Sequence, residues 1–319
     1  MNELCRLLDI QYPIIQGGMG NISHPVLTAA VSNAGGLGTL GVGTMIPKEI
    51  ETKIIETKQK TDKPFSVNIP IQVSTDPKAM IKLVIEHQIP AVTLSAGNPA
   101  PYIPKLHEHG IKVLVVVGNI RQAAKAVEAG ADVIIGEGFE AAGINSPQEL
   151  TTLTLVQQLT EAVSVPIVAA GGISNGRGLA AMMMLGAQGV QMGTRFVATK
   201  DAPFSSAYKE KILRATDHCT VVLGRKVGRV RRVLKTAYAE SLLEKENENL
   251  SLEEWAQLTS EEYHIKGAIE GNEIEGFMNS GQIAAIIHDL PSVDELLQTM
   301  MQELIDSVKK INEKLQSSI

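Results

Sequence analysis

Short apolar runs recur along the chain, and each is followed by glycine or polar residues and then by an amphipathic segment. Several runs are apolar at consecutive positions, as in LVVV and VII, which is typical of strands buried on both faces of a parallel sheet. We therefore expect buried strands at residues 14–16, 37–40, 65–68, 91–94, 113–117, 133–135, 167–170 and 190–192.

The segments between these runs carry the signals of helices. Asp76 is a good N-cap with Pro77 at the first helical position, and the apolar residues that follow share one face. His24 precedes Pro25 in the same way, and Gly35 stands where a helix C-cap belongs. Strand and helix alternate about eight times, which is the pattern of a (β/α)₈ TIM barrel. A doubly wound open sheet is the alternative, because periodicity alone does not separate the two folds.

The alternation stops after Thr199. Residues 200–276 lack buried strand-like runs and are rich in Lys, Arg and Glu, so we expect a smaller, mainly helical domain inserted after the eighth strand. Short surface helices are expected over 250–255 and 258–263, and a long amphipathic helix over 291–315. The predicted domains are therefore a barrel at 1–199, a small helical domain at 200–276 and C-terminal helices that complete the barrel at 277–319.

Composition narrows the class of protein. A chain of 319 residues with 44% apolar and 20% charged residues can bury a core, so disorder is not expected. The net charge of −6 and the aromatic content of 3% argue against a nucleic-acid binder. No apolar stretch reaches about 18 residues and no signal peptide is recognisable, so we expect a cytoplasmic protein without a membrane span. Cys5 and Cys219 lie far apart, so we expect reduced thiols and no metal site.

The surplus of glycine, 28 residues, gathers after the expected strands. Gly171 and Gly172 follow the seventh strand, and Gly193 and Thr194 follow the eighth, where (β/α)₈ enzymes often bind phosphate. Glycine lets backbone N–H groups approach a phosphate closely, and the threonine adds a hydroxyl donor. We therefore predict a phosphate site formed by these two loops.

Other strand ends also carry glycine or polar side chains, which suits a flat polar ligand bearing a phosphate. They include Gly18 and Met19, Asn68, Gly97, and the segment 137–143. The segment 36–41 formally matches the dinucleotide fingerprint G-x-G-x-x-G. However, it follows a helix and is itself strand-like, so we interpret it as close-packed barrel turns.

Eight segments spanning nearly the whole chain carry a family resemblance. They are 12–19 (YPIIQGGM), 31–38 (VSNAGGLG), 63–69 (KPFSVNI), 96–99 (AGNP), 137–143 (EGFEAAG), 165–173 (VPIVAAGGI), 185–196 (LGAQGVQMGTRF) and 280–284 (SGQIA). Together they resemble the nitronate monooxygenase family, once called 2-nitropropane dioxygenases. That family also includes the FMN-dependent enoyl-acyl-carrier-protein reductases.

The resemblance implies a barrel that binds FMN, with NAD(P)H as a candidate electron donor. By it, Gly18 and Met19 lie against the flavin ring, Asn68 hydrogen-bonds the flavin, and the two glycine loops hold its 5′-phosphate. The full set of predicted cofactor contacts is Gly18, Met19, Asn68, Gly97, Glu137, Ala142, Gly143, Gly171, Gly172, Gly193, Thr194 and Gln282.

One position departs from the family pattern. The family has a histidine, associated with catalysis in both branches, directly after the glycine that matches Gly143, but this chain has Ile144. An isoleucine neither transfers a proton nor donates a hydrogen bond. The catalytic residue is therefore left open, with Glu137, Asn145 and His24 as candidates.

A basic segment lies in the expected small domain. It comprises Arg225, Lys226, Arg229, Arg231, Arg232 and Lys235, without an acidic residue among them. One interpretation is a solvated helix face. The other is a seat for an acidic ligand, such as a nicotinamide nucleotide phosphate, coenzyme A or an acidic acyl carrier protein. His218, His264 and His288 show no partner pattern and are assigned no role.

Four functions are compatible with these features. The first is an FMN oxidase of the nitronate monooxygenase type, whose nitronate substrate is already an anion and needs no base. The second is an NAD(P)H-dependent FMN reductase of an enoyl thioester or a quinone. The others are a phosphate-binding barrel without flavin chemistry and a catalytically divergent FMN-binding paralogue. We expect a small-molecule substrate and no nucleic-acid or membrane partner, and a homodimer is left open.

Overall fold

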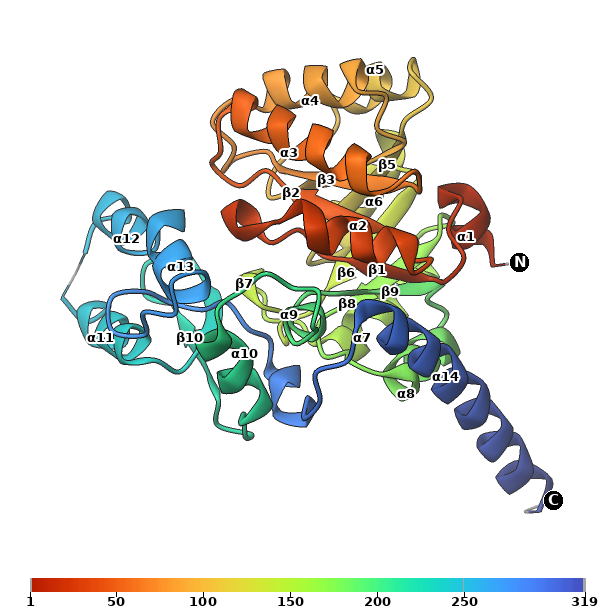
Figure 1. Cartoon of the computed structure of the whole chain (residues 1–319). Helices are drawn as coiled ribbons and strands as arrows, with labels where there is room; N and C mark the ends of the chain where they lie inside the picture. The colour runs from red at the N-terminus through yellow and green to blue at the C-terminus, as the bar shows by residue number, and fades with distance from the viewer. Residues whose placement is uncertain (1, 249, 318–319) are drawn as a thin grey trace.

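The computed structural model describes residues 2–248 and 250–317, and its centre is a closed barrel of parallel strands (Figure 1). The strands follow the order β1-β9-β8-β6-β5-β4-β3-β2 in one sheet. The sheet closes between its two ends: the Gln16 N–H donates to the Leu37 carbonyl at 2.9 Å, and the Leu37 N–H donates to the Ile14 carbonyl at 3.0 Å. This closure confirms the TIM barrel and excludes the doubly wound open sheet.

All eight predicted strands are present. They are β1 (Ile14–Gln16), β2 (Gly38–Gly41), β3 (Phe65–Pro70), β4 (Ala91–Ser95), β5 (Lys112–Val117), β6 (Val133–Glu137), β8 (Ile167–Ala170) and β9 (Gly189–Met192). The label β7 belongs to a strand of another sheet, so β8 and β9 are the seventh and eighth strands of the barrel. The segment 36–41, which formally matches the dinucleotide fingerprint, contains β2. It is therefore part of the barrel backbone. A Cβ atom on Gly38 would lie 2.0 Å from the Thr28 carbonyl oxygen.

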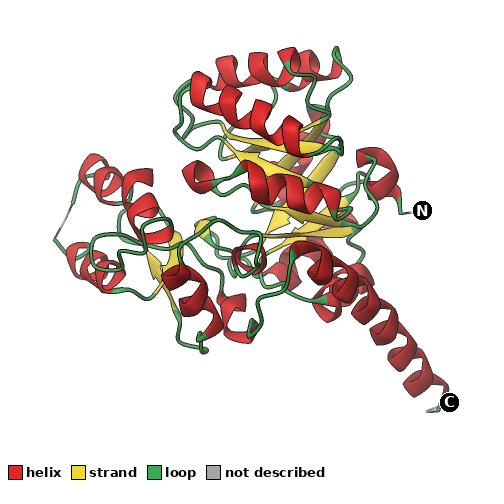
Figure 2. Cartoon of the chain, in the orientation of Figure 1, coloured by secondary structure: helices red, strands yellow, loops and turns green. Residues whose placement is uncertain are grey.

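Helices surround the strands (Figure 2). They are α2 (Pro25–Asn33), α3 (Pro47–Lys60), α4 (Pro77–Glu86), α5 (Ile103–His107), α6 (Ile120–Glu128), α7 (Thr152–Ala162) and α8 (Gly176–Met184). The predicted cap of α4 is confirmed, because the Asp76 carboxylate accepts from the Ala79 N–H at 2.9 Å. The N-terminal helix α1 (Glu3–Leu8) packs Leu4 and Leu8 in one apolar cluster with Ile15 of β1 and with Leu37, which directly precedes β2. That packing closes the amino end of the barrel and leaves the carboxyl ends of the strands for a site.

The chain after β9 contains strands as well as helices. It contains α9 (Thr194–Val197), α10 (Ser206–Leu213), β10 (Thr220–Leu223), β11 (Arg231–Leu234), α11 (Ala237–Lys245), α12 (Leu252–Leu258) and α13 (Glu261–Ala268). The expectation that 200–276 lacks buried strands is wrong. Strand β11 pairs antiparallel with β10 and with β7 (Gly143–Ile144) to form a three-stranded sheet. The helix-face interpretation of the basic segment is also wrong, since the segment forms a turn and β11.

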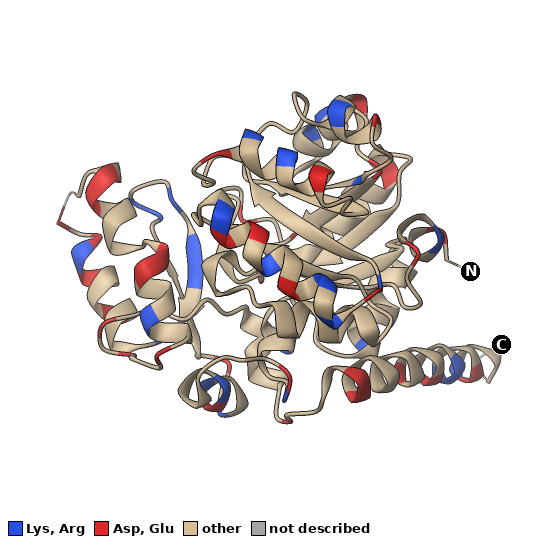
Figure 3. Cartoon of the chain, turned by 45° about the horizontal axis from the view of Figure 1, so that its top comes forward, with Lys and Arg blue, Asp and Glu red and all other residues tan. Residues whose placement is uncertain are grey.

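This small sheet has its own core, built from residues such as Trp255 and Phe277. Because β7 lies in the connection between β6 and α7, the barrel sequence supplies one strand of the small sheet. Figure 3 shows basic residues on this sheet, whereas the barrel strands are drawn almost entirely in tan. The domain boundaries at 199/200 and 276/277 stay a prediction.

The C-terminal part returns to the barrel. The 3-10 helix η2 (Gln282–Ile286) precedes α14 (Val293–Gln316), which matches the long amphipathic helix expected there. The first turns of α14 bury Val293, Leu297 and Met300, and its C-terminal half extends away from the body (Figure 1). In the described part of the chain, no helix has both the length and the apolar character needed to cross a bilayer.

Candidate functional site

A cavity of about 1780 Å³ opens at the carboxyl ends of the barrel strands. Its walls come from the ends of β1, β3, β4, β6, β8 and β9 on one side, and from β11, α12 and α13 on the other. Small-molecule sites usually measure about 300–1,000 Å³. The cavity therefore has room for a cofactor and a second ligand beside it.

Nearly all the predicted cofactor contacts line this cavity. They are Gly18, Met19, Asn68, Gly97, Glu137, Ala142, Gly143, Gly171, Gly172, Gly193 and Thr194. Gln282 is the exception. It is exposed at the start of η2, and its neighbours Gly281 and Ile283 line the cavity instead. The Gln282 N–H donates to the Glu140 carbonyl at 3.0 Å, which fixes this turn against the loop after β6.

The two loops expected to hold phosphate lie side by side because β8 and β9 are paired. Gly171 and Gly172 adopt φ angles of +97° and +72°, a region that favours glycine. A Cβ atom on Gly193 would meet no atom within 4 Å, so free space lies in front of this residue. The Thr194 hydroxyl accepts from the Gly281 N–H at 2.9 Å, and its own hydrogen remains available to a ligand. Bare backbone and one hydroxyl therefore border a free volume.

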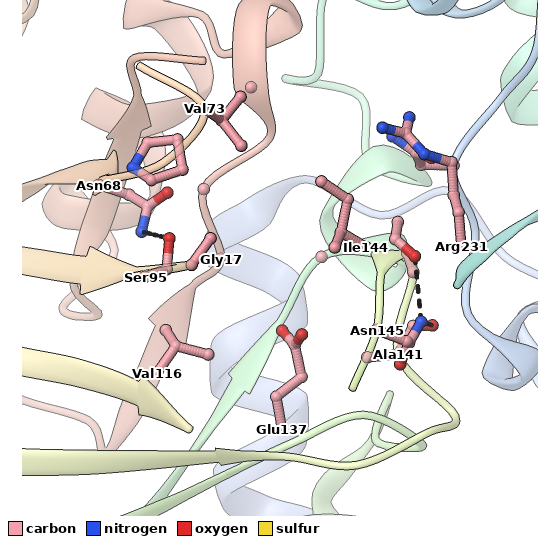
Figure 4. Close-up of a pocket in the computed structure, with 18 of the residues that line it drawn as sticks. Gly17, Asn68, Val73, Ser95, Val116, Glu137, Ala141, Ile144, Asn145 and Arg231 are labelled. Atoms are coloured by element: carbon pink, nitrogen blue, oxygen red, sulfur yellow. Dashed lines mark hydrogen bonds between the residues drawn. The ribbon is translucent and has the colours of Figure 1, made fainter. Parts of the chain in front are cut away.

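The opposite wall depends on a close approach between Gly18 and Asn68. A Cβ atom on Gly18 would lie 2.7 Å from the Asn68 amide oxygen, so only glycine fits there. The Asn68 amide nitrogen donates to the Ser95 hydroxyl at 3.2 Å and to the Thr93 carbonyl at 3.3 Å, which holds the side chain in place (Figure 4). The backbone after β1 and this amide thus form one wall of the cavity.

Glu137 is an ionisable residue that lines the cavity at the end of β6. Figure 4 shows its carboxylate extending from the end of β6 into the cavity. Burial raises the pKa of Glu137 to about 7. No hydrogen bond of this carboxylate is found within residues 2–248 and 250–317. It can therefore hold or release a proton near neutral pH.

The other catalytic candidates have structural partners. Asn145 is buried, and its amide nitrogen donates to the Ala141 and Gly143 carbonyls at 3.1 and 3.0 Å, which braces the loop after β6. A second carboxylate of this loop, Glu140, accepts from the Thr152 N–H at 2.9 Å and so caps α7. His24 is not among the residues that line the cavity. Its Nδ1 accepts from the Val26 N–H at 3.2 Å, so it caps α2 instead.

Ile144 lines the cavity with 53% of its surface exposed, and its cross-strand partner on β11 is Arg231. The Arg231 guanidinium lies 4.9 Å from the centre of the Phe277 ring. Of the basic segment, only Arg229 and Arg231 line the cavity. The others bind elsewhere: Arg225 pairs with Glu149, Lys226 donates to Asn247, Arg232 donates to the Phe139 carbonyl and Lys235 pairs with Glu240.

The sequence interpretation missed a polar cluster on α13. His264 is 2% exposed, lines the cavity, and has its Nδ1 3.4 Å from Glu261 Oε2. Glu261 also accepts from the Asn21 N–H at 3.1 Å, which ties α13 to the loop after β1. Burial acts to raise the pKa of Glu261, but the bond to His264 and the charge of Arg231 bring it below its ordinary value. The spacing E-x-x-H on a helix was the available signal.

Asn279 completes this cluster. Its amide nitrogen lies 3.2 Å from His264 Nε2, and its side chain is the nearest to a Cβ atom placed on Gly143. Its amide oxygen is buried and has no hydrogen-bond partner among the described residues. The wall behind Gly143 therefore presents an unused acceptor.

Comparison with known proteins agrees with the geometry. A family model described as nitronate monooxygenase matches residues 2–80 and 70–303. Among curated proteins, the chain is 32% identical to (3aS,4S,5R,7aS)-5-hydroxy-7a-methyl-1-oxo-octahydro-1H-indene-4-carboxyl-CoA dehydrogenase of Rhodococcus jostii, over 97% of this chain and 96% of the relative. It is 30% identical to a probable nitronate monooxygenase of Staphylococcus aureus, over 97% and 98% of the two chains.

Two solved structures are similar to this chain over nearly its whole length. FabK from Thermotoga maritima is 40% identical with a TM-score of 0.93, covering 98% of this chain and 99% of that one. Nitroalkane oxidase from Streptomyces ansochromogenes is 25% identical with a TM-score of 0.84, covering 97% and 99%. Both similarities extend over the barrel and the small sheet together.

Proposed function

The chain belongs to the nitronate monooxygenase family, a family of oxidoreductases, and on that premise we propose that it is an FMN-dependent oxidoreductase that oxidises alkyl nitronates with dioxygen. The observation that carries the proposal is the strand-end cavity, in which the bare backbone of Gly171, Gly172 and Gly193 borders free volume. A phosphate fits where such backbone lies at the ends of the seventh and eighth barrel strands.

The residues present fit FMN. Gly171, Gly172, Gly193 and Thr194 would hold its phosphate, and the wall formed by Gly18 and Asn68 would lie against its ring. The unused Asn279 acceptor and the free space before Gly193 are features that a polar, phosphorylated ligand would satisfy. When bound, FMN supplies a redox centre that takes up electrons from the substrate and passes them to dioxygen.

The residues around Ile144 favour a substrate that arrives as an anion. Neither Ile144 nor the loop-bracing Asn145 abstracts a proton, so the position of the family histidine offers no base to a neutral nitroalkane. A nitronate has already lost its proton. In the proposed reaction the carbon–nitrogen bond breaks as nitrite leaves, and dioxygen supplies the carbonyl oxygen, so that one dioxygen converts two nitronates to two carbonyl compounds and two nitrites. Glu137 would hold or move a proton at its carboxylate near neutral pH.

A second candidate is reduction of an enoyl thioester with NAD(P)H as the electron donor. The specific observation in its favour is the size of the cavity, which exceeds what FMN and a small nitronate need. The exposed Arg229 on its lining could bind the phosphates of such a substrate. The Rhodococcus jostii relative is named for a CoA thioester, which supports the same candidate.

The two candidates separate in one experiment on FMN-loaded protein. Oxygen uptake and nitrite release are measured with ethyl and propyl nitronate, and flavin absorbance is followed after anaerobic mixing with NADPH. We expect turnover of nitronates and slow or no bleaching by NADPH. Rapid bleaching by NADPH together with reduction of crotonyl-CoA would instead support the second candidate.

A further inference from the structure

We propose that Arg231 forms an oxyanion-binding site for the substrate, directly beside Ile144. This inference rests on the proposed function, because it assigns the group that binds the substrate of that reaction. Arg231 would bind the substrate directly, through a side chain with a permanent positive charge. The ligand class is a planar oxyanion conjugated to the reacting carbon.

The register of the small sheet places Arg231 at the cavity. In the antiparallel pair β7–β11, Arg231 is directly opposite Ile144, and Arg232 is opposite Gly143. Directly opposed side chains lie on the same face of a sheet with Cβ atoms about 4.5–5.5 Å apart. Arg231 therefore shares the cavity face with Ile144 (Figure 4). Side chains alternate along a strand, so Arg232 points to the other face, where it donates to the Phe139 carbonyl at 3.0 Å.

Among the described residues, no carboxylate bonds directly to Arg231. Within residues 2–248 and 250–317, its guanidinium makes no ion pair and no hydrogen bond. The acid whose charge acts on it, Glu261, already accepts from the Asn21 N–H and lies against His264. A partly buried guanidinium without a directly bonded counterion is unfavourable, and an anionic ligand in the cavity would offset that cost.

The surroundings of Arg231 define the ligand it would take. The guanidinium carbon lies 4.9 Å from the centre of the Phe277 ring, and no hydrogen bond within residues 2–248 and 250–317 uses the guanidinium N–H groups, which are therefore available to a ligand. The edge of a guanidinium matches a group with two oxygens in one plane. A nitronate has two oxygens on one nitrogen, and an enoyl thioester develops charge on its carbonyl oxygen during reduction.

The test compares R231Q with K235Q in FMN-loaded protein. Lys235 is a matched control, because it lies just past the end of the same strand, is exposed, pairs with Glu240 at 3.4 Å and does not line the cavity. Each variant is assayed with propyl nitronate and with crotonyl-CoA. We expect kcat/KM to fall about 10- to 100-fold in R231Q on the substrate that the enzyme turns over. K235Q should match the unaltered enzyme.

A binding measurement separates this role from a structural one. Nitrate is a planar oxyanion, and its dissociation constant is measured by calorimetry on each variant. We expect Kd for nitrate to rise at least about 10-fold in R231Q. Added guanidinium chloride should restore part of the activity of R231A. Should R231Q fold poorly, R231K keeps the charge without the planar fork and should give an intermediate loss.

The outcomes are distinct from those that test the proposed function. Equal kcat/KM and equal nitrate affinity in R231Q and K235Q would overturn the Arg231 site, even in a fully active flavoenzyme. Loss of nitrate binding in R231Q would support the site, even where the protein retains no FMN. FMN content is measured for every variant, so a change in cofactor occupancy is not mistaken for a change in substrate binding.

Discussion

Replacing Gly193 with aspartate tests FMN phosphate binding with little effect on the stability of the apoprotein. Gly193 has a φ of −112°, which any residue adopts, and a Cβ atom there would meet nothing within 4 Å. The new side chain therefore enters free space without displacing an atom of the protein. We expect the free energy of unfolding of the apoprotein to change by no more than about 0.5 kcal/mol.

The effect on FMN binding is large by comparison. A carboxylate about 4 Å from a phosphate charge, at an effective dielectric constant of about 20, opposes binding by about 4 kcal/mol. That energy corresponds to roughly a thousandfold increase in Kd. The neighbouring Gly172 is a poorer choice for this test, because its φ of +72° would strain any other residue.

The assay is titration of the apoprotein with FMN, followed by flavin fluorescence, for the unaltered chain and for G193A and G193D. The alanine variant controls for the added volume, and its Kd should rise far less than that of the aspartate variant. Thermal unfolding of the three apoproteins provides the check on folding. Full FMN occupancy in G193D, at the affinity of the unaltered chain, would refute the placement of the phosphate.

Three further perturbations test the site and the packing. Glu137→Gln should change the dependence of stability on pH. The raised pKa means that the folded chain holds a proton that the unfolded chain releases, so the stability of the unaltered protein should fall as the pH rises from about 4.5 to about 7. The variant should lack that fall and gain up to about 3 kcal/mol at pH 8, read from thermal unfolding across pH. Trp255→Ala should cost about 3–5 kcal/mol in chemical denaturation, because this side chain is 2% exposed in the core of the small sheet, whereas Leu252→Ala at a residue 54% exposed should cost about 0.5 kcal/mol or less. Gly38→Ala should destabilise the barrel by at least about 1–3 kcal/mol, since its Cβ would lie 2.0 Å from the Thr28 carbonyl; unchanged unfolding would contradict that close packing.

The barrel could be predicted because its signals are local. Each strand is a short apolar run, and helix caps such as Asp76 and His24 lie within three residues of the groups they bind. The position of a glycine after a strand is also local, so the expected phosphate loops could be located by counting strands. In a closed barrel, that count determines which loops are neighbours.

The small sheet could not be predicted, because its pairing is long-range. Strand β7 is only Gly143–Ile144, and its partner β11 begins at Arg231. A strand that opens with two arginines does not show the apolar run used for the barrel strands. Ile144 and Arg231 are neighbours only because of that strand register. The sequence therefore showed that Ile144 replaces the family histidine, but it did not show that Arg231 lies beside it.

The polar cluster on α13 was missed for the same reason. The spacing of Glu261 and His264 is visible in the sequence. However, a Glu and a His three residues apart are found on many helices that face solvent. Their importance follows from contacts with Asn21 and Asn279, which come from other parts of the chain. For Gln282 the opposite happened. The sequence pointed to a turn that borders the cavity, but the residues that line the cavity are its neighbours Gly281 and Ile283.

Anaerobic mixing of the FMN-reconstituted protein with propyl nitronate tests the central claim most directly. The account predicts that the absorbance of the oxidised flavin disappears on mixing and returns when dioxygen is admitted, with release of nitrite. A flavin spectrum that stays unchanged with nitronate at every concentration tried would contradict it.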